Sequence, residues 1–375
     1  MNNIIPFNKP SIVGNEIHYI KDAISYGHIS GDGPYTKKSS SLLKNILQTN
    51  KVLLTTSCTD ALEMTAILLR IKPGDEIIVP SFTFVSTINA FVLRGAEPVF
   101  IDIRPDTLNL DESQLESLIT PKTKAIVVVH YAGVGCDMNE IIHIAQKYDI
   151  PVIEDNAHGL FGKYNNQYLG TFGTFSTQSF HETKNFTCGE GGALFINDEK
   201  YIERAEIIRE KGTNRSKFFK GEVDKYTWVD IGSSFLLSDL SAAFLYGQLE
   251  QRHLIQRKRK NIWNYYHSKL EDWASNHGIK LPHIPNNCEQ TYHMFYLIMP
   301  SFELRTKLIN HLKMNGLHAV FHYLPLHLSP MGKIHANHNS HCHVTEFVSD
   351  RIVRLPFYTN LDVNQINFEI FYNFK

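Results

Sequence analysis

The chain has 375 residues, of which 43% are hydrophobic and 20% are charged, a balance typical of a globular protein with an extensive core. The 37 lysines and arginines nearly match the 38 aspartates and glutamates, which excludes the strongly basic surface of a non-specific nucleic-acid-binding protein. No apolar run reaches the roughly 20 residues that span a bilayer, and the N-terminus lacks the pattern of a signal peptide. The five cysteines are scattered without a C-x-x-C pair, which argues against a disulfide framework. We therefore expect a cytoplasmic protein that binds neither nucleic acid nor membrane.

Short apolar segments alternate with helical patterns from residue 51 onward. The helix-like stretch TFVSTINAFVLRG separates IIVP (77–80) from PVFIDI (98–103), and NEIIHIAQKYDI separates AIVVVHY (125–131) from PVIEDNA (151–157). This alternation is typical of βαβ units, in which helices cover both faces of a parallel sheet. It predicts an α/β fold whose ligands bind at the carboxyl ends of the strands.

Two carboxylates close one of the predicted strands. Glu154 and Asp155 end the strand VIED, and His158 follows three residues later. A carboxylate at the end of a buried strand is costly unless it has a charged or hydrogen-bonding partner. Taken alone, this pattern is best explained by a helix cap or a salt bridge. The functional alternative is an acid that keeps the pyridinium nitrogen of pyridoxal phosphate (PLP) protonated.

The segment TTSCTDALEM, residues 55–64, passes from a strand into a helix. Ser57, Cys58 and Thr59 stand at the helix start, where free backbone N–H groups and the helix dipole favour a phosphate. Ordinary N-capping by Ser or Thr is the simpler explanation. A reactive Cys58 thiol is a further alternative, but no His-Asn pattern near it supports a thiol enzyme.

The segment SFHETKNFTCGEGG, residues 179–192, places Lys184 between a Ser-Phe-His entry and a glycine-rich exit. An isolated lysine is nearly always a solvated charge. Here the glycines allow sharp turns or close approach of the backbone. A lysine in a partly desolvated site has a lowered pKa and can form a Schiff base with an aldehyde.

In order and spacing, these three clusters resemble the DegT/DnrJ/EryC1/StrS sugar aminotransferases, a family of fold-type I PLP enzymes. The resemblance extends over essentially the whole chain and includes IPFNKP, GDGPYTK, IIREKGTNR, DKYTWVDIGSSF, HMFYL and VFHYLPLH. It is strongest to the dTDP-4-keto-6-deoxyglucose 4-aminotransferases. It implies a large PLP-binding domain (1–250) with a mixed, mostly parallel seven-stranded sheet, and a smaller C-terminal α+β domain (251–375).

The resemblance also implies roles for the residues that match the family's motifs. Lys184 matches the lysine that binds PLP and then moves protons during the reaction. Asp155 matches the partner of the pyridinium nitrogen, His158 matches the residue beside the cofactor's 3-hydroxyl, and Phe84 matches the aromatic side chain that stacks on the pyridine ring. The residues that match the phosphate cup are Cys58, Thr59 and Ser179.

One segment departs from the pattern of many relatives. They carry G-x-N-x-R, which reaches the cofactor phosphate of the neighbouring subunit, whereas this chain reads GSSFL over residues 232–236. Ser234 is able to replace the Asn contact, but Leu236 cannot replace an arginine. The resemblance implies a homodimer with shared active sites, and the variant segment resembles that of the dTDP-sugar 4-aminotransferases.

The implied reaction transfers the amino group of L-glutamate to C4 of dTDP-4-keto-6-deoxyglucose, with a gluco or a galacto product. Lys211, Arg215 and Lys225 are candidate contacts for the substrate diphosphate, and His322 is a candidate contact for the sugar. The basic run QRKRK (256–260) is better explained as a solvated helix face. A 3-keto or GDP-linked sugar is the alternative substrate.

Two alternatives from other classes of protein stay open. A PLP-binding regulator is disfavoured by the intact Lys184 and by the lack of an appended DNA-binding segment, and a dehydratase of the same fold would lack this lysine. The segment HANHNSHCH offers zinc ligands, but its spacing matches no closed structural site and a solvated loop explains it better. We therefore predict no metal centre. The potential ligands in this segment are His335, His338, His341, Cys342 and His343.

Overall fold

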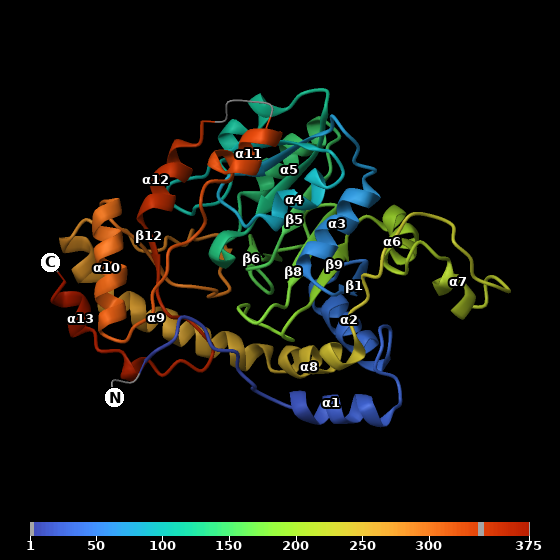
Figure 1. Cartoon of the computed structure of the whole chain (residues 1–375), viewed down its shortest axis with the longest axis horizontal. Coiled ribbons are helices and arrows are strands. Elements are labelled where there is room, and N and C mark those ends of the chain that lie inside the picture. The colour runs from blue at the N-terminus through green and yellow to red at the C-terminus, as the bar shows by residue number, and fades with distance from the viewer. Residues whose placement is uncertain (1–3, 337–340, 375) are drawn as a thin grey trace.

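The computed structural model describes residues 4–336 and 341–374, and a seven-stranded sheet lies at its centre (Figure 1). The strand order is β1-β9-β8-β5-β4-β2-β3, and β9 is antiparallel to both of its neighbours while the pairs from β8 to β3 are parallel. This confirms the predicted α/β fold with a mixed, mostly parallel sheet. The strands are β1 (Lys51–Thr55), β2 (Glu76–Pro80), β3 (Glu97–Ile101), β4 (Thr123–Val129), β5 (Val152–Asp155), β8 (Phe175–Ser179) and β9 (Gly192–Ile196).

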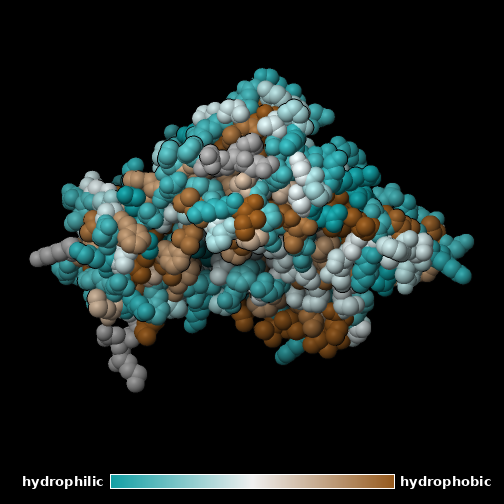
Figure 2. Space-filling view, turned by 45° about the horizontal axis from the view of Figure 1, so that its top comes forward, coloured by the Kyte–Doolittle hydropathy of each residue, from teal (hydrophilic) through white to brown (hydrophobic). Residues whose placement is uncertain are grey.

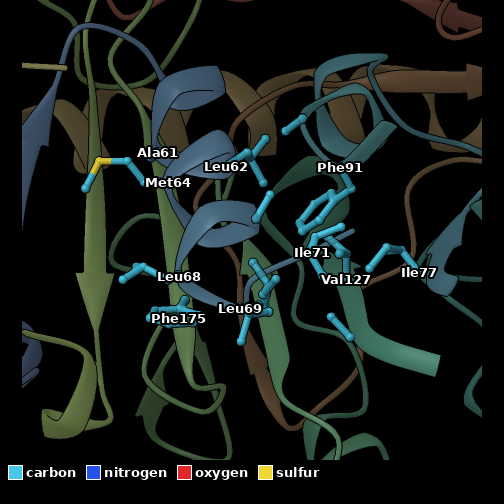
Figure 3. Close-up of a cluster of buried hydrophobic side chains, with 14 of the residues drawn as sticks. Ala61, Leu62, Met64, Leu68, Leu69, Ile71, Ile77, Phe91, Val127 and Phe175 are labelled. Atoms are coloured by element: carbon cyan, nitrogen blue, oxygen red, sulfur yellow. The ribbon is translucent and has the colours of Figure 1, made fainter. Parts of the chain in front are cut away.

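Helix α3 (Cys58–Leu68) lies against this sheet, and its inward face contributes to a large core cluster that also includes side chains of the strands (Figure 3). Apolar residues fill most of its positions because the helix is covered by the sheet on one side and by α4 and α6 on others. Ser57 caps it, since its side chain accepts a hydrogen bond from the Asp60 N–H at 3.0 Å, which fixes where the helix begins. The other helices of this part are α1 (Glu16–Ser25), α2 (Pro34–Leu47), α4 (Ser86–Val92), α5 (Met138–Lys147), α6 (Ile202–Arg209), α7 (Arg215–Phe219) and α8 (Asp239–Glu250).

A second core forms around the long helix α9 (Arg252–Asn276). The N-terminal segment joins it, because Ile5 forms a parallel bridge with Leu317 and is buried in the same cluster. This core therefore contains both ends of the described chain. Its other elements are β11 (Tyr296–Ile298), α10 (Phe302–Met314), β12 (Ile352–Arg354) and α13 (Glu369–Tyr372), and α12 (His343–Arg351) packs on α10 and β11. Helix α11 (Pro330–His335) instead contacts β3 of the large sheet. The short strands β6 (Lys163–Tyr164), β7 (Gln167–Tyr168) and β10 (Cys288–Glu289) form a separate small sheet.

Two features of the surface stand out. A segment of residues 211–231 that includes α7 projects away from the sheet, and we call it the arm (Figure 1). Hydrophobic residues also gather along the edge of the molecule on which α1 lies (Figure 2). Among the described helices, none is both long and apolar enough to cross a membrane.

The strand directions decide where the site forms. β1, β2, β4, β5 and β8 all run the same way, so the residues that follow them meet at one edge of the sheet. Because β9 runs the opposite way, its first residue, Gly192, lies at this edge too. The start of α3, Asp155 and the loop that carries Lys184 are thereby brought together.

Candidate active site

Lys184 lies in the loop that joins β8 to β9, and this loop is fixed by hydrogen bonds on both sides of the lysine. The Lys184 N–H donates to the His181 carbonyl at 2.9 Å, and the Cys188 N–H donates to the Phe180 carbonyl at 2.9 Å. The Asn185 side chain donates to the Thr291 carbonyl at 2.8 Å. The lysine Nζ has no hydrogen-bond or ion-pair partner within the described parts of the chain. The backbone is thus held while the amine stays free.

The environment of Lys184 favours its neutral form. Burial lowers its pKa to about 8, with the charge of Arg354 acting in the same direction, while Asp155 and Cys58 oppose the shift. Since the unprotonated amine is the nucleophile, a lowered pKa increases its reactive fraction near neutral pH. The amine is therefore suited to react with an aldehyde.

Asp155 is buried at the end of β5 and is oriented by two donors. The Thr87 hydroxyl donates to its Oδ2 at 2.8 Å, and the Ala157 N–H donates to its Oδ1 at 3.2 Å. Burial raises the pKa of Asp155, and the hydrogen bond from Thr87 and the charge of Lys184 oppose this. A buried carboxylate with so few donors is stabilised when a cationic N–H group meets it. Sequence reasoning missed Thr87, which packs as an ordinary helix residue of α4.

The start of α3 approaches β9 very closely. A Cβ at Gly192 would lie 2.3 Å from the Ser57 carbonyl carbon and 2.4 Å from the Cys58 nitrogen, so only glycine fits there. Thr59 donates from its hydroxyl to Ser86 at 2.9 Å, and Ser179 accepts a hydrogen bond from the His181 N–H at 3.4 Å. The predicted phosphate-cup residues Cys58, Thr59 and Ser179 thus surround a helix start of the kind that binds phosphate.

Cys58 is not a reactive thiol in this arrangement. Burial raises the pKa of its thiol, and the negative charge of Asp155 raises it further. A thiol nucleophile needs the opposite shift, toward the thiolate. The raised pKa therefore disfavours the alternative of a reactive Cys58 thiol.

His158 belongs to a stacked pair of histidines beside Lys184. Its ring stacks on His293 at a centroid distance of 4.1 Å and an angle of 16°. His293 in turn shares a hydrogen bond of 2.8 Å with the Asn185 side chain. Burial lowers the pKa of both histidines well below the usual value, and the positive charge of Lys184 adds to this. Both rings are therefore neutral, and His158 Nδ1 is buried without a hydrogen-bond partner in the described structure.

The predicted aromatic and substrate contacts occupy different environments. Phe84 is 57% exposed and its ring faces Tyr323 at 6.5 Å, so it is accessible to a planar ligand. His322 is buried, and its Nδ1 lies 2.7 Å from the Tyr131 hydroxyl. Its ring also stacks on Tyr323 at 3.6 Å. His322 thus lies beside Tyr323, as Phe84 does, and one of its ring nitrogens already bonds Tyr131.

The predicted diphosphate cations lie on the arm or at its base. Arg215 binds Glu210 at 2.8 Å, and Lys211 lies 3.7 Å from the same carboxylate. Lys225 has no ion pair among the described residues. Ser234 forms an antiparallel bridge with Glu210, the carboxylate that Arg215 and Lys211 approach.

The histidine-rich segment gives no metal cluster within the described residues. No group of three or more His, Cys, Asp or Glu side chains in residues 4–336 and 341–374 is arranged to hold a metal ion. Cys342 is buried, while the rings of His341 and His343 stack on each other. His338 lies outside the described residues.

The mixed sheet and the free lysine opposite a strand-end aspartate are typical of PLP-dependent aminotransferases. Comparison with known proteins gives the family: the profile of the DegT/DnrJ/EryC1/StrS aminotransferase family matches residues 10–368. The chain belongs to this family and is a PLP-dependent transaminase.

Relatives cover nearly the whole chain. MJ1066 of Methanocaldococcus jannaschii, an uncharacterized protein, is 32% identical over 366 residues, which are 96% of this chain and 94% of that protein. Spr1654 of Streptococcus pneumoniae in its PMP form is 29% identical, with a TM-score of 0.90 and 98% of each chain covered. PseC of Helicobacter pylori, an aminotransferase of pseudoaminic acid biosynthesis, is 25% identical, with a TM-score of 0.89 over 99% of this chain and 98% of that one.

The residues present fit PLP. Among the described residues, the N–H groups of Cys58 and Thr59 at the start of α3 have no acceptor, Asp155 has no cationic partner within hydrogen-bond distance, and the Lys184 amine of lowered pKa has no partner. His158 Nδ1 is a buried polar atom that still lacks a partner. These four features meet at one edge of the sheet, as binding of a phosphorylated pyridine aldehyde requires.

Proposed function

We propose that this protein transfers the amino group of L-glutamate to C4 of dTDP-4-keto-6-deoxy-D-glucose, giving a dTDP-4-amino-4,6-dideoxyhexose. The product, of gluco or galacto configuration, would serve O-antigen or other surface polysaccharide synthesis. The observation that carries the proposal is the free amine of Lys184, whose pKa is lowered to about 8 beside the buried Asp155. PseC, a transaminase of sugar biosynthesis with the same fold, supports a sugar substrate.

In this proposal, each residue of the site has one task toward PLP. The start of α3 with Cys58 and Thr59, together with the Ser179 hydroxyl, holds the phosphate. Asp155, oriented by Thr87, holds a proton on the pyridine nitrogen. The remaining contacts are those of Phe84, which covers one face of the ring, and His158, which lies beside the 3-hydroxyl.

PLP supplies an electron sink for the negative charge that develops at the reacting carbon. Lys184 acts as general acid and base in both halves of the reaction. Its Nζ takes the proton from the α-carbon of the amino donor, and later returns a proton to C4 of the acceptor. The lowered pKa suits this work, because a catalytic base is most effective when its pKa lies near the working pH.

We further propose that the protein works as a homodimer. Phe219 is 71% exposed and Trp228 is 76% exposed on the arm, and such large apolar side chains on a projecting segment mark an interaction surface. A second copy that covers the arm would also bring Ser234 near the partner's cofactor phosphate. Lys211, Arg215 and Lys225 then remain our candidates for the diphosphate of the acceptor.

The five cysteines are all unpaired, which supports a cytoplasmic location.

The proposal is tested with purified protein, PLP, L-glutamate and enzymatically prepared dTDP-4-keto-6-deoxyglucose. We expect equal amounts of 2-oxoglutarate and aminated sugar, and the ring-proton couplings in NMR give the configuration at C4. Lys184→Ala should abolish both products. Formation of 2-oxoglutarate in an amount equal to the PLP, without aminated sugar, would contradict the choice of acceptor and favour a 3-keto or GDP-linked sugar.

A further inference from the structure

A cleft between the long helix α9 and the segment 282–292 is separate from the residues proposed to bind PLP and the substrates. Its volume is about 860 Å³, which is enough for an organic molecule of nucleotide size. Lys184 does not line it, nor does any other predicted cofactor or substrate contact. We call it the α9 cleft, and its lining includes Phe161, Arg257, Lys260, Trp263, His283 and Tyr292.

The basic run QRKRK (256–260) does not form a single solvated helix face, as its composition led us to expect. Arg259 is buried and donates to two backbone carbonyls. Lys258 bonds an asparagine side chain at 2.7 Å. Arg257 and Lys260 are exposed and lie about one turn apart on α9, and both line the cleft. The run thus supplies two cations to one concave surface.

These two cations have no counter-ion within the described structure. Neither the Arg257 nor the Lys260 side chain forms a hydrogen bond or an ion pair with any residue in 4–336 and 341–374. Glu289, an acidic residue of the lining, already pairs with Lys163 at 3.2 Å. The cleft is therefore positively charged and favours an anion, and two neighbouring cations suit a phosphate or diphosphate group.

The walls of the cleft are aromatic and include strained backbone. Trp263 is 8% exposed and stacks on His267 at a centroid distance of 5.2 Å. Phe161 and Tyr292 have φ angles of 69° and 53°, a conformation that bulky residues rarely adopt and that is frequent at ligand sites. Trp263 Nε1 and Gln256 Oε1 are buried without hydrogen-bond partners in the described structure, which indicates a missing partner on this wall. Aromatic walls beside two free cations match a ligand with both a planar ring and a phosphate.

Two of the aromatic residues of the lining belong to segments that fix the lysine loop. The Phe161 ring meets Phe186, two residues after the lysine, at a centroid distance of 5.2 Å. Tyr292 is the middle residue of the segment 291–293, both ends of which bond the Asn185 side chain. A ligand that moves Phe161 or Tyr292 therefore acts on the loop that carries the reactive amine.

We propose that the α9 cleft is a second, non-catalytic ligand site that binds a nucleoside phosphate and thereby regulates the cofactor site. Arg257 and Lys260 bind the phosphates, while Phe161 and Tyr292 contact the base. Binding changes the packing on the lysine loop, so the nucleotide and PLP alter each other's affinity by the same factor. This inference does not depend on which sugar the enzyme aminates.

ADP is the probe for the binding test, because aromatic contacts accept any base and adenine is not part of the proposed acceptor. Calorimetry with the PLP-loaded protein should give one ADP per chain with a Kd below about 1 mM. Arg257→Met and Lys260→Met should each weaken ADP binding by about tenfold or more, since each removes a hydrogen bond to a charged group. The absence of ADP binding, or binding that both variants retain, would overturn the proposal.

Two controls make the binding result specific. Lys269→Met removes an exposed cation that helical spacing places on the opposite face of α9 from Lys260, and it should change the ADP affinity by less than about threefold. Pyrophosphate should bind at least about tenfold more weakly than ADP, because it lacks the ring that contacts the aromatic walls. Equal affinities for pyrophosphate and ADP would refute a nucleoside ligand.

Tryptophan fluorescence locates the bound nucleotide. ADP should change the fluorescence of the wild-type protein, and this change should be absent from Trp263→Phe. A change that persists in Trp263→Phe would place the nucleotide outside the α9 cleft. Because Arg257 and Lys260 are exposed, their variants should fold, and they test the site even if Trp263→Phe is unstable.

The regulatory effect is tested without any turnover. The ADP affinity, followed through the Trp263 signal, should differ about fivefold or more between the PLP-loaded protein and the apo-protein. ADP should change the affinity for PLP by the same factor in the wild type, but not in Arg257→Met. Equal ADP affinities in the two forms would refute the action on the lysine loop, whether or not a sugar is aminated.

Discussion

The close approach of β9 to the start of α3 gives the sharpest structural prediction, for the variant Gly192→Ala. The added Cβ would lie 2.3 Å from the Ser57 carbonyl carbon and 2.4 Å from the Cys58 nitrogen. Non-bonded carbon atoms normally stay about 3.5 to 4.0 Å apart. Both atoms are backbone, so no side chain can turn aside, and the helix start must move by roughly 1 Å relative to β9.

Two consequences follow from this displacement. Overpacking of this kind costs about 1 to 3 kcal/mol of unfolding free energy. The N–H groups at the start of α3 would also lose their alignment with the phosphate, and since a hydrogen bond to a charged group is worth about 1.5 to 3 kcal/mol, the loss of one weakens PLP binding by roughly 10- to 100-fold. Gly192→Ala should therefore lower both the thermal stability of the apo-protein and its affinity for PLP.

The assay is a titration of the apo-protein with PLP, followed by absorbance, together with thermal unfolding without PLP. Gly189→Ala is the matched control from the same loop. Gly189 has a φ of +86°, and a Cβ added there would have no atom of another part of the chain within 4 Å. Alanine at this position therefore adds backbone strain of about 1 kcal/mol but moves nothing at the helix start. The reasoning is refuted if Gly192→Ala binds PLP with wild-type affinity, or if both variants lose affinity equally.

Three further predictions concern the proposed roles. Asp155→Asn should fold normally but lower kcat about 10²- to 10³-fold, because the amide cannot stabilise a charged N–H group as the carboxylate does. Steady-state kinetics and thermal unfolding check this, and a loss of kcat below about threefold would contradict the proposed role of Asp155. The rate of PLP binding to the apo-protein should rise with pH up to about 8 and then level off, since Lys184 is protonated and unreactive below its pKa of about 8. Stopped-flow absorbance measures this rate. A rise that continues to about pH 10, near the pKa of a solvated lysine, would contradict the lowered pKa. Trp228→Ser together with Phe219→Ser should shift the molar mass in light scattering from a dimer toward a monomer, whereas the wild-type protein running as a monomer would exclude the proposed interface.

The sequence predicted the position of a site residue where that position depends only on the strand next to it. Asp155 follows an apolar strand and Lys184 precedes the glycines that begin the next one, so both could be expected at the carboxyl edge of a parallel sheet. The alternation of strands and helices likewise predicted the α/β class, and the resemblance to a family predicted a mixed sheet of seven strands.

Contacts between distant segments could not be predicted in this way. The hydrogen bond between Asn185 and the Thr291 carbonyl joins residues 106 positions apart, and that between Tyr131 and His322 joins residues 191 positions apart. His322 was predicted as a substrate contact from an aromatic segment, but no local pattern indicates that one of its ring nitrogens already bonds Tyr131.

These long-range contacts explain how one lysine is both held and free. A Schiff-base lysine must keep its backbone fixed while its amine moves between cofactor and substrate. The structure separates the two demands: Asn185, next to Lys184, bonds the Thr291 carbonyl and His293, and His293 stacks on His158. The segment 291–293 therefore fixes the lysine loop and the proposed 3-hydroxyl contact at the same time, while Nζ keeps no partner among the residues that the structure describes. A shift of this segment would alter the cofactor environment and the position of the lysine together, which makes the C-terminal part of the chain a functional part of the site.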